Sequence, residues 1–429
     1  MSHPESVSSS QLPQPELAPE ILEALAFERS KWATGSVHTD PFYTLPLKTT
    51  SDSSLPGTLL KVQESVDPTL YSPPSSVSIS RIIYQSLTLI GDPIPVSAYI
   101  LWPLLPRRNS DGSSQIVAWA HGTSGIFSEC APSHLRILHQ HFLTPYALVL
   151  SGYVVVATDY AGLRVSHCSQ PQNKPLIHHC LANPAAANDV IYSIVAARSA
   201  FPSIGSKFVS IGHSQGRGAV WAIAQHNAKE NIEGYLGGIA ISLTTDIRSN
   251  FDPIGAAVWE GMMLVIKTIE GDGAVGMGLF LPLALKGKLL RQGWRDNEWV
   301  IKYNDLIMNG GREISGPLLI IHGEKEPLID FTLMEKAVYD TAMKYPGSEL
   351  ELMRLPTTHD SAITGSQWIW MDWIRERFEG KVIERCGEMH SGKGKLNRER
   401  SIVLERPEEN YGFETNWFMA RATESYHEF

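Results

Sequence analysis

Short runs of consecutive apolar residues recur along the middle of the chain, and longer stretches with helical periodicity separate them. The runs occupy 116–120, 154–157, 208–211, 238–241 and 318–321. A strand that is apolar on both faces is typical of a parallel sheet covered by helices on both sides. The pattern therefore predicts an α/β fold with a doubly wound, mostly parallel sheet.

Two strands with a different pattern precede these runs. Residues 79–89 and 96–102 alternate in polarity or are rich in β-branched side chains, and Gly91-Asp92-Pro93 lies between them. A turn signal between two such segments predicts an antiparallel pair.

Two helices are indicated clearly. Asn183-Pro184 offers an N-cap residue followed by a proline suited to the first helical position, so a helix is expected over 185–200. A second helix is expected over 366–378, where large apolar residues recur at helical spacing and favour core packing. Those residues are Trp370, Trp373, Ile374 and Phe378.

The order of these patterns divides the chain into parts. The insertion between 246 and 311 lies between two sheet strands and is too apolar for an exposed loop, so we expect a helical cap over the carboxyl ends of the strands. Extra core helices without a role in substrate choice are the alternative. An amphipathic helix over 19–32 is expected to pack outside the main body. The predicted parts are an N-terminal arm (1–40), a core (41–245 and 312–380), the cap (246–311) and a C-terminal extension (381–429), packed or forming a flap.

Composition and charge limit the class of partner. The 429 residues are 43% hydrophobic and 19% charged, with a formal net charge of -9 and a pI near 5.9. Nucleic acids and anionic membranes attract basic surfaces. The balance therefore argues against both and favours a neutral or apolar small molecule.

The chain carries no pattern for secretion or membrane insertion. The first 14 residues are polar, without the apolar segment of a signal peptide. The longest apolar stretch, 274–285, contains Pro282 and is shorter than the roughly 20 residues that a spanning helix needs. We expect a cytoplasmic protein without a transmembrane segment; a mature secreted form is the alternative. The oligomeric state stays open, with a homodimer as one option.

The cysteines and histidines do not form a metal-binding pattern. Four cysteines are widely spaced and include no C-x-x-C pair, which favours reduced structural thiols: Cys130, Cys168, Cys180 and Cys386. In an oxidising compartment, a bridge from Cys130 to Cys168 or Cys180 is the alternative. Four histidines lack the neighbours to complete a ligand set: His139, His141, His178 and His179. We expect no metal and no cofactor.

The motif Gly212-His213-Ser214-Gln215-Gly216 follows the apolar run at 208–211 and precedes a helix-like stretch, 217–228. A strand that turns sharply into a helix presents the serine at the tip, so Ser214 is the candidate nucleophile. The turn is so tight that side chains at Gly212 and Gly216 are expected to collide with the neighbouring strand and helix. A small serine in a glycine-rich turn is the alternative.

A serine hydroxyl needs a base to accept its proton and an acid to orient that base. His359 is the candidate base, in a loop after the strand-like 349–355, where an imidazole can reach Ser214. Glu326, in the loop after the run at 318–321, is the favoured acid. Asp330 is the alternative acid, followed by Glu324 or a more distant residue.

The developing negative oxygen requires two donors. The backbone N-H of Gln215, at the start of a helix, is expected to be one of them. The second is expected from the loop His121-Gly122-Thr123-Ser124-Gly125 that follows the run at 116–120, most simply the N-H of Thr123. His121 is expected to be structural.

With these residues, the chain resembles the α/β-hydrolase superfamily, and within it the fungal secretory-lipase-like group that includes yeast lipase A-type enzymes. The resemblance extends over roughly residues 40 to 380 and rests on six pieces in the family's order: Asp40-Pro41-Phe42-Tyr43, 119–123, 159–162, 212–216, 321–324 and His359. It implies hydrolysis of esters or acyl-glycerols through an acyl-enzyme, a helical lid and no cofactor. Three features depart from the family: Glu326 replaces the usual Asp, Arg217 follows the elbow, and no leader is present.

The favoured function is a serine-dependent carboxylic ester hydrolase acting on a neutral or apolar small-molecule ester. The missing leader points away from extracellular lipid digestion, and fungal secondary metabolism is one setting for such an esterase. An acyltransferase with the same three residues is one alternative. A non-catalytic binding protein on the hydrolase scaffold is the other, because a fold does not fix a function.

Overall fold

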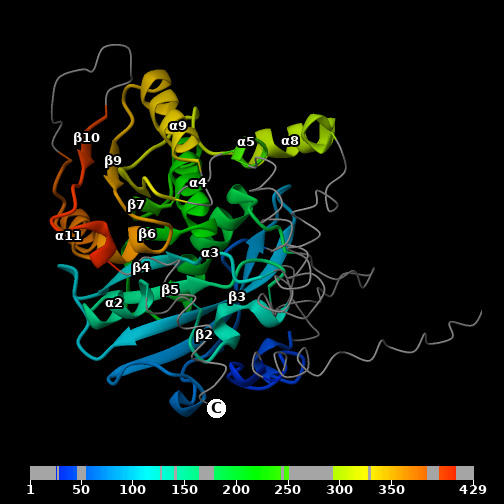
Figure 1. Ribbon diagram of the computed structural model, residues 1–429. Coiled ribbons are helices and arrows are strands. Elements are labelled where there is room, and N and C mark those ends of the chain that lie inside the picture. Colours follow the sequence, from blue (N-terminus) through cyan, green and yellow to red (C-terminus); the bar gives the residue numbers. More distant parts are fainter. Residues whose placement is uncertain are drawn as a thin grey trace, which may run out of the picture.

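A large sheet runs through the molecule and organises all the parts described below (Figure 1). The computed structural model describes residues 26, 29–45, 55–125, 128–139, 143–163, 178–242, 246–250, 293–326, 330–383 and 396–411.

The sheet has ten strands in the order β1-β2-β3-β5-β4-β6-β7-β8-β9-β10. The pairs β1/β2, β2/β3 and β3/β5 are antiparallel, and all the others are parallel. The predicted α/β class with a mostly parallel sheet is therefore confirmed. The strands are β1 (Leu59–Gln63), β2 (Val77–Leu87), β3 (Pro93–Pro103), β4 (Ser114–Ala120), β5 (Val154–Thr158), β6 (Ile204–His213), β7 (Tyr235–Ile241), β8 (Leu318–Gly323), β9 (Leu350–Leu355) and β10 (Arg398–Ser401).

The apolar runs supply two hydrophobic cores, one on each face of the sheet. In β4, Ile116 and Ala118 belong to one core, whereas Val117 and Trp119 belong to the other. All four side chains are fully buried. Alternate residues of a strand point to opposite faces, so a strand buried on both sides must be apolar at every position.

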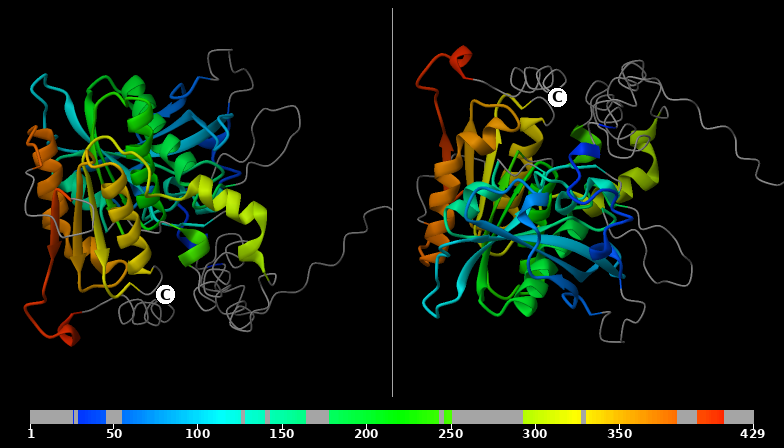
Figure 2. Two further views of the ribbon diagram at one scale, coloured as in Figure 1. Left: turned by 90° about the horizontal axis from the view of Figure 1, so that it is seen from above. Right: turned by 90° about the horizontal axis from the view of Figure 1, so that it is seen from below.

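Helices cover both faces of the sheet (Figure 2). Helices α3, α4 and α9 contribute to one core, while α2, α10 and α11 contribute to the other. The helices are α2 (Pro145–Leu150), α3 (Asn183–Ala200), α4 (Gln215–Lys229), α5 (Ile247–Asn250), α8 (Glu298–Ile307), α9 (Phe331–Lys344), α10 (Ser361–Gly365) and α11 (Gln367–Phe378).

The two predicted helices are present, with one correction. In α11, the residues Trp370, Trp373 and Ile374 are buried as core, as expected. The expected N-cap of α3 is wrong, because Asn183 is the first helical residue and makes no side-chain cap. Its amide instead donates to the carbonyl of Ile307 at 2.9 Å, which joins α3 to α8.

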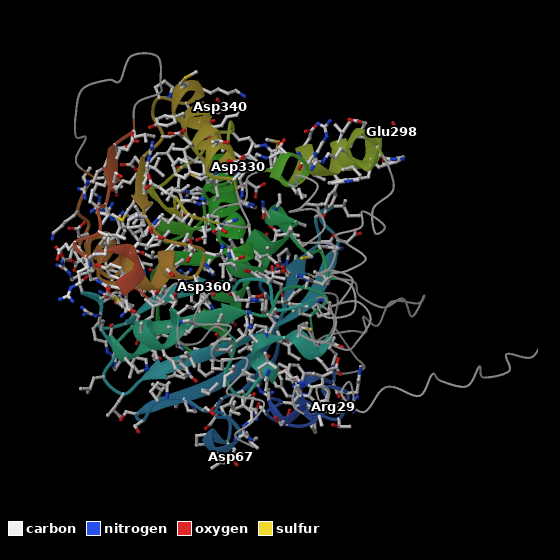
Figure 3. The ribbon with its side chains drawn as sticks, viewed as in Figure 1. Arg29, Asp67, Glu298, Asp330, Asp340 and Asp360 are labelled. Atoms are coloured by element: carbon white, nitrogen blue, oxygen red, sulfur yellow. The ribbon has the colours of Figure 1, made fainter. Side chains whose placement is uncertain are left out.

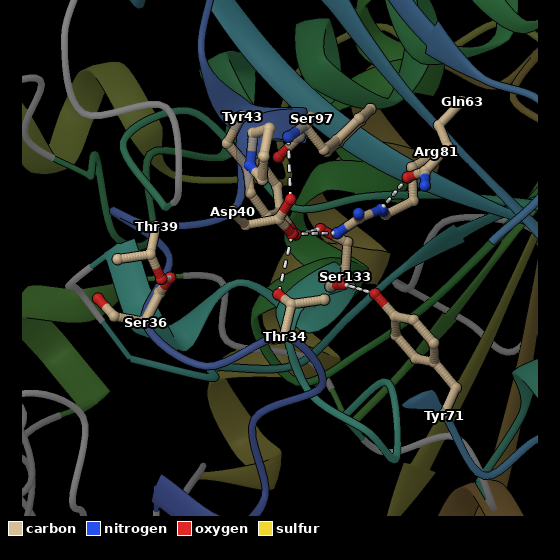
Figure 4. A network of polar contacts seen from close by, with 12 residues as sticks. Thr34, Ser36, Thr39, Asp40, Tyr43, Gln63, Tyr71, Arg81, Ser97 and Ser133 are labelled. Carbon is tan, nitrogen blue, oxygen red and sulfur yellow. Dashed lines mark hydrogen bonds and ion pairs between the residues drawn. The ribbon is translucent and has the colours of Figure 1, made fainter. Parts of the chain in front are cut away.

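The N-terminal arm is attached through a buried cluster that we call the Asp40 network (Figure 4). The carboxylate of Asp40 accepts hydrogen bonds from Arg81 at 2.8 Å, from Thr34 at 2.9 Å and from the N-H of Phe42 at 2.9 Å. Burial acts to raise the pKa of Asp40, but the charge and hydrogen bond of Arg81 outweigh it and lower that pKa. The network consists of Thr34, Asp40, Tyr43, Arg81, Ser97, Ser133 and Asp159.

A second carboxylate completes the Asp40 network. Asp159 follows β5 and accepts hydrogen bonds from Ser97 Oγ at 2.6 Å, Ser133 Oγ at 2.5 Å and Ser133 N-H at 2.8 Å. Ser133 Oγ in turn accepts from the hydroxyl of Tyr43 at 2.7 Å, so the residues directly after the arm bond to the same cluster. Burial raises the pKa of Asp159 to about 6, because the hydrogen bonds and Arg81 only partly compensate for lost hydration.

The outer parts of the chain are described only in part. The predicted helix over 19–32 lies mostly outside the described residues, and so does most of the predicted cap, from 251 to 292. Its described remainder includes α5 and α8. The C-terminal extension contributes β10, which pairs with β9 and is linked to it by a bond from Arg354 to Glu399 at 2.5 Å. In the described ranges, no helix is long and apolar enough to cross a bilayer.

Candidate active site

Ser214 lies at the turn between β6 and α4, where its backbone has φ 54° and ψ −118°. Left-handed backbone is strained for any residue that carries a Cβ. The N-H of Ser214 donates to the carbonyl of Ile241 at 3.2 Å, which fixes the turn to the end of β7. The turn places Ser214 at the carboxyl end of the parallel strands, where the residue is half-buried.

The two glycines of the motif permit this turn. A Cβ on Gly212 would lie 2.4 Å from the carbonyl oxygen of Gly216, and one on Gly216 would lie 1.9 Å from the carbonyl oxygen of Ala120 in β4. Real Cβ atoms essentially never approach backbone so closely. Any larger residue at either position would push α4 away from the sheet.

His359 lies in the loop between β9 and α10, and its backbone is held against the elbow. Its carbonyl accepts a hydrogen bond from Ser242 Oγ at 2.8 Å and one from His213 Nε2 at 3.2 Å. The rings of His213 and His359 lie 4.7 Å apart, centroid to centroid. Because His213 directly precedes Ser214, these contacts hold the loop of the candidate base beside the turn that carries the candidate nucleophile.

The carboxylate that contacts His359 is Glu326. Its Oε2 lies 2.5 Å from His359 Nδ1, and the side chain of Glu326 is fully buried, whereas that of His359 is 12% exposed. A carboxylate on Nδ1 holds the proton there, which leaves Nε2 of a neutral ring as the basic nitrogen.

Backbone contacts align the loops that carry Glu326 and His359. The N-H of Glu324 donates to Leu355 at 2.7 Å and the N-H of Lys325 donates to Thr357 at 3.0 Å. A Cβ on Gly323 would lie 2.3 Å from the carbonyl oxygen of Thr357, so the loops approach closely because residue 323 is glycine.

The other two acid candidates lie elsewhere. Asp330 is the N-cap of α9, where its carboxylate accepts from the N-H and hydroxyl of Thr332 at 2.8 and 2.7 Å. Figure 3 shows Asp330 at the start of that helix, apart from Asp360, the neighbour of His359. Glu324 is exposed.

Arg217, one of the departures from the family pattern, is fully buried in the first turn of α4. Burial lowers the pKa of Arg217 well below its usual value, and the negative charge of Glu326 opposes that change. The negative charge of Glu326 therefore acts on the buried guanidinium of Arg217 as well as on His359.

The structure brings together the two residues expected to stabilise the oxyanion. Thr123 Oγ1 donates to the side-chain oxygen of Gln215 at 3.2 Å. His121 Nδ1 donates to the carbonyl of Gly122 at 2.6 Å, and the ring lies 4.3 Å from that of Tyr160. Burial lowers the pKa of His121 to about 3, so the ring is neutral near pH 7. That the backbone N-H groups of Gln215 and Thr123 point toward a substrate oxygen stays a prediction.

Three polar residues at the site were not expected from the sequence: His178, His213 and Ser242. His178 is buried and bonds to the side chain of Gln215 at 3.1 Å. The second position of a G-x-S-x-G motif could have suggested a role for His213. No local pattern marks His178 or Ser242, because both reach the site only through tertiary contacts.

The cysteines and histidines can now be compared with the expectations. Cys180 is a free thiol, so it does not bridge to Cys130, while Cys168, Cys386 and His141 lie outside the described residues. Within the described ranges, one set of potential ligand atoms lies within 4.8 Å of one another, on His213, His359 and Asp360. One nitrogen of each histidine in this set is already engaged, His213 Nε2 with the carbonyl of His359 and His359 Nδ1 with Glu326.

Comparison with known proteins supports the fold. No protein-family model matches the chain, and no curated protein matches it. Among solved structures, lipase A of Candida antarctica in its closed state matches with a TM-score of 0.61 at 14% identity, over 82% of this chain and 89% of that one. The esterase LipA of Xanthomonas oryzae matches with a TM-score of 0.53 at 17% identity, over 75% of this chain and all of that one. The chain therefore has the α/β-hydrolase fold that these proteins share.

Proposed function

We propose that this protein is a serine-dependent carboxylic ester hydrolase that acts through an acyl-enzyme on a neutral or apolar small-molecule ester. The observation that carries the proposal is the bond between Glu326 and His359 Nδ1. The loop of His359 is in turn bonded to His213, which directly precedes the strained turn at Ser214. An acid, a base and a serine in these relations constitute the machinery of acyl transfer.

The reaction follows from these positions. Ser214 Oγ attacks the carbonyl carbon of the ester while its proton passes to His359 Nε2, and Glu326 stabilises the imidazolium that forms. The tetrahedral intermediate collapses, the C–O bond to the alcohol breaks, and the alcohol leaves with the proton from His359. Water then attacks the acyl-enzyme by the same route and releases the acid and Ser214.

The intermediate carries a negative oxygen that must be stabilised. We assign this role to the backbone N-H groups of Gln215 and Thr123. The N-H of Gln215 lies in the first turn of α4, where backbone donors are not used by the helix and its dipole favours an anion. The overall charge of -9 disfavours anionic esters as substrates.

The proposal is tested by labelling and turnover together. A fluorophosphonate probe should modify Ser214 in the folded protein, as located by peptide mass spectrometry. p-Nitrophenyl esters from acetyl to palmitoyl should be hydrolysed, and S214A should lower kcat/KM by at least about 10³-fold. S206A, at an exposed serine of β6, is the matched control and should behave as the wild type.

The alternatives give different results in the same assay. Transfer of the acyl group to an added alcohol in preference to water would identify an acyltransferase. A folded protein that neither reacts with the probe nor hydrolyses any ester would contradict the proposal and favour a binding protein.

A further inference from the structure

A chain of hydrogen bonds links a buried histidine to both residues of the proposed oxyanion site. His178 Nδ1 bonds to the carbonyl of Ala161 at 2.8 Å, and His178 Nε2 bonds to Gln215 Nε2 at 3.1 Å. The other end of the Gln215 amide, Oε1, accepts from Thr123 Oγ1 at 3.2 Å and from the thiol of Cys180 at 3.6 Å.

The chemistry of each partner determines the direction of every bond. A carbonyl oxygen can only accept, so His178 Nδ1 must carry the proton and donate to Ala161. In a neutral ring, Nε2 is then an acceptor and receives the N-H of the Gln215 amide. This orients the amide with its oxygen toward Thr123, where a hydroxyl donates to it. With a neutral His178, the donors and acceptors of Ala161, His178 and Gln215 match in only this arrangement.

His178 is well placed to maintain this arrangement. It is 6% exposed, and burial lowers its pKa to about 4, although the bond to Ala161 acts in the opposite direction. The ring also stacks beside Tyr160, with centroids 6.1 Å apart. A neutral ring with one defined tautomer therefore faces Gln215 at ordinary pH.

We infer that His178 is a positioning residue of the oxyanion hole: by accepting from the Gln215 side chain, it holds that residue and the Thr123 loop together so that their backbone N-H groups converge on one oxygen. This inference rests on the proposed function. His178 does not touch the substrate and acts only through Gln215.

Two neutral substitutions separate the two nitrogens of His178. In H178Q, the longer amide places an acceptor near the former Nε2 and loses the donor to Ala161. In H178N, the shorter amide keeps a donor near the former Nδ1 and loses contact with Gln215. The inference therefore expects H178Q to retain activity and H178N to lose it, whereas a purely structural anchor on Ala161 predicts the reverse.

The kinetic readout is specific for the oxyanion. H178N should lower kcat about 10- to 100-fold with KM changed less than about threefold, because the support acts on the transition state. A boronic acid forms a tetrahedral, negatively charged adduct with Ser214 that places an oxygen at the oxyanion site. It should lose affinity for H178N in parallel with kcat/KM, and H178Q should stay within about fivefold of the wild type. Equal activity of the two variants, or higher activity of H178N, would overturn the inference.

A measurement on the wild-type protein keeps the test independent of whether the variants fold. In protein labelled with ¹⁵N-histidine, NMR should show His178 protonated at Nδ1, with Nε2 unprotonated and hydrogen-bonded. The opposite tautomer would overturn the inference without any enzyme assay. If the wild type is active and H178N is equally active, the role of His178 is refuted while the proposed function stands. If the wild type neither hydrolyses esters nor labels at Ser214, the proposed function is refuted and the role of His178 with it.

Discussion

The Asp40 network and the candidate active site are both buried clusters of polar groups, but they are completed in different ways. In the Asp40 network, Arg81 pairs with Asp40, and Asp159 accepts three hydrogen bonds. At the active site, the backbone of Ser214 is strained and the serine remains half-buried. The first arrangement serves stability, whereas the second, under the proposed function, gives up some stability to present the hydroxyl of the candidate nucleophile.

The largest effect should come from breaking the pair of Glu326 and His359. E326Q keeps the size of the side chain but removes the charge that supports the imidazolium, so kcat/KM should fall about 10³- to 10⁴-fold. D330N is the matched control, because Asp330 caps α9 without contacting His359 in the bonds described above. It should cost about 1 kcal/mol of stability at most and leave the rate unchanged. Ester hydrolysis measures the rate and urea unfolding the stability of the two variants. Loss of activity in D330N but not in E326Q would assign the role of the acid to Asp330.

Removing the cation of the Asp40 network should lower stability and leave turnover nearly unchanged, which is the opposite of the result expected for E326Q. R81M leaves Asp40 buried without its ion-pair partner, so the free energy of unfolding should fall by about 3–5 kcal/mol. Turnover per folded molecule should stay within about threefold of the wild type, since Arg81 does not contact Ser214, His359 or Glu326 in the bonds described. The double variant D40N/R81M should recover part of the loss. Unchanged stability in R81M would show that the two clusters do not differ as we describe.

Asp159 should make stability depend on pH. Its pKa is about 6 in the folded protein against an ordinary value of 3.8, so the folded state binds the proton more tightly. Stability from this group is complete below pH 3.8 and is lost as pH rises through 6. D159N should remove that dependence, a change of about 2 kcal/mol. Urea unfolding at pH 4.5 and 7.5 tests this dependence. An equal change in the free energy of unfolding between the two pH values in the wild type and in D159N would contradict the prediction.

The smallest expected change in stability measures the strain at Ser214. Glycine adopts positive φ without a steric cost, so S214G should raise the free energy of unfolding by about 1 kcal/mol while abolishing ester hydrolysis. S206G, at an exposed serine of β6, should lower it by about 0.5–1 kcal/mol. Thermal and urea unfolding compare the two. Destabilisation by S214G would mean that the elbow stores no strain.

The sequence predicted features that depend on chain order and short patterns. Apolar runs predicted a parallel sheet because strands covered on both sides need apolar residues at every position, and Ile116 to Ala120 show this directly. Glu326 and His359 were placed by their positions after β8 and β9, and the structure sets them side by side. Their roles in catalysis remain predictions.

Other features could not be read from the chain because they depend on contacts between distant segments. His178 and Gln215 are 37 positions apart, and Ser242 and His359 are 117 apart. No short pattern encodes which loops meet at the end of a sheet. Asn183 was misassigned for the same reason: its amide finds a carbonyl on α8, and this tertiary contact replaces the local cap.

The short strand β10 has a consequence for solubility. Without it, the backbone N-H and C=O groups along one side of β9 would be open to pairing with another molecule, the usual beginning of β-aggregation. β10 occupies those groups and is itself only four residues long, with Arg398, Glu399 and Arg400 in succession. Brief, charged outermost strands discourage further pairing. A chain shortened to end after α11 should therefore keep its fold yet precipitate at concentrations where the full chain stays in solution.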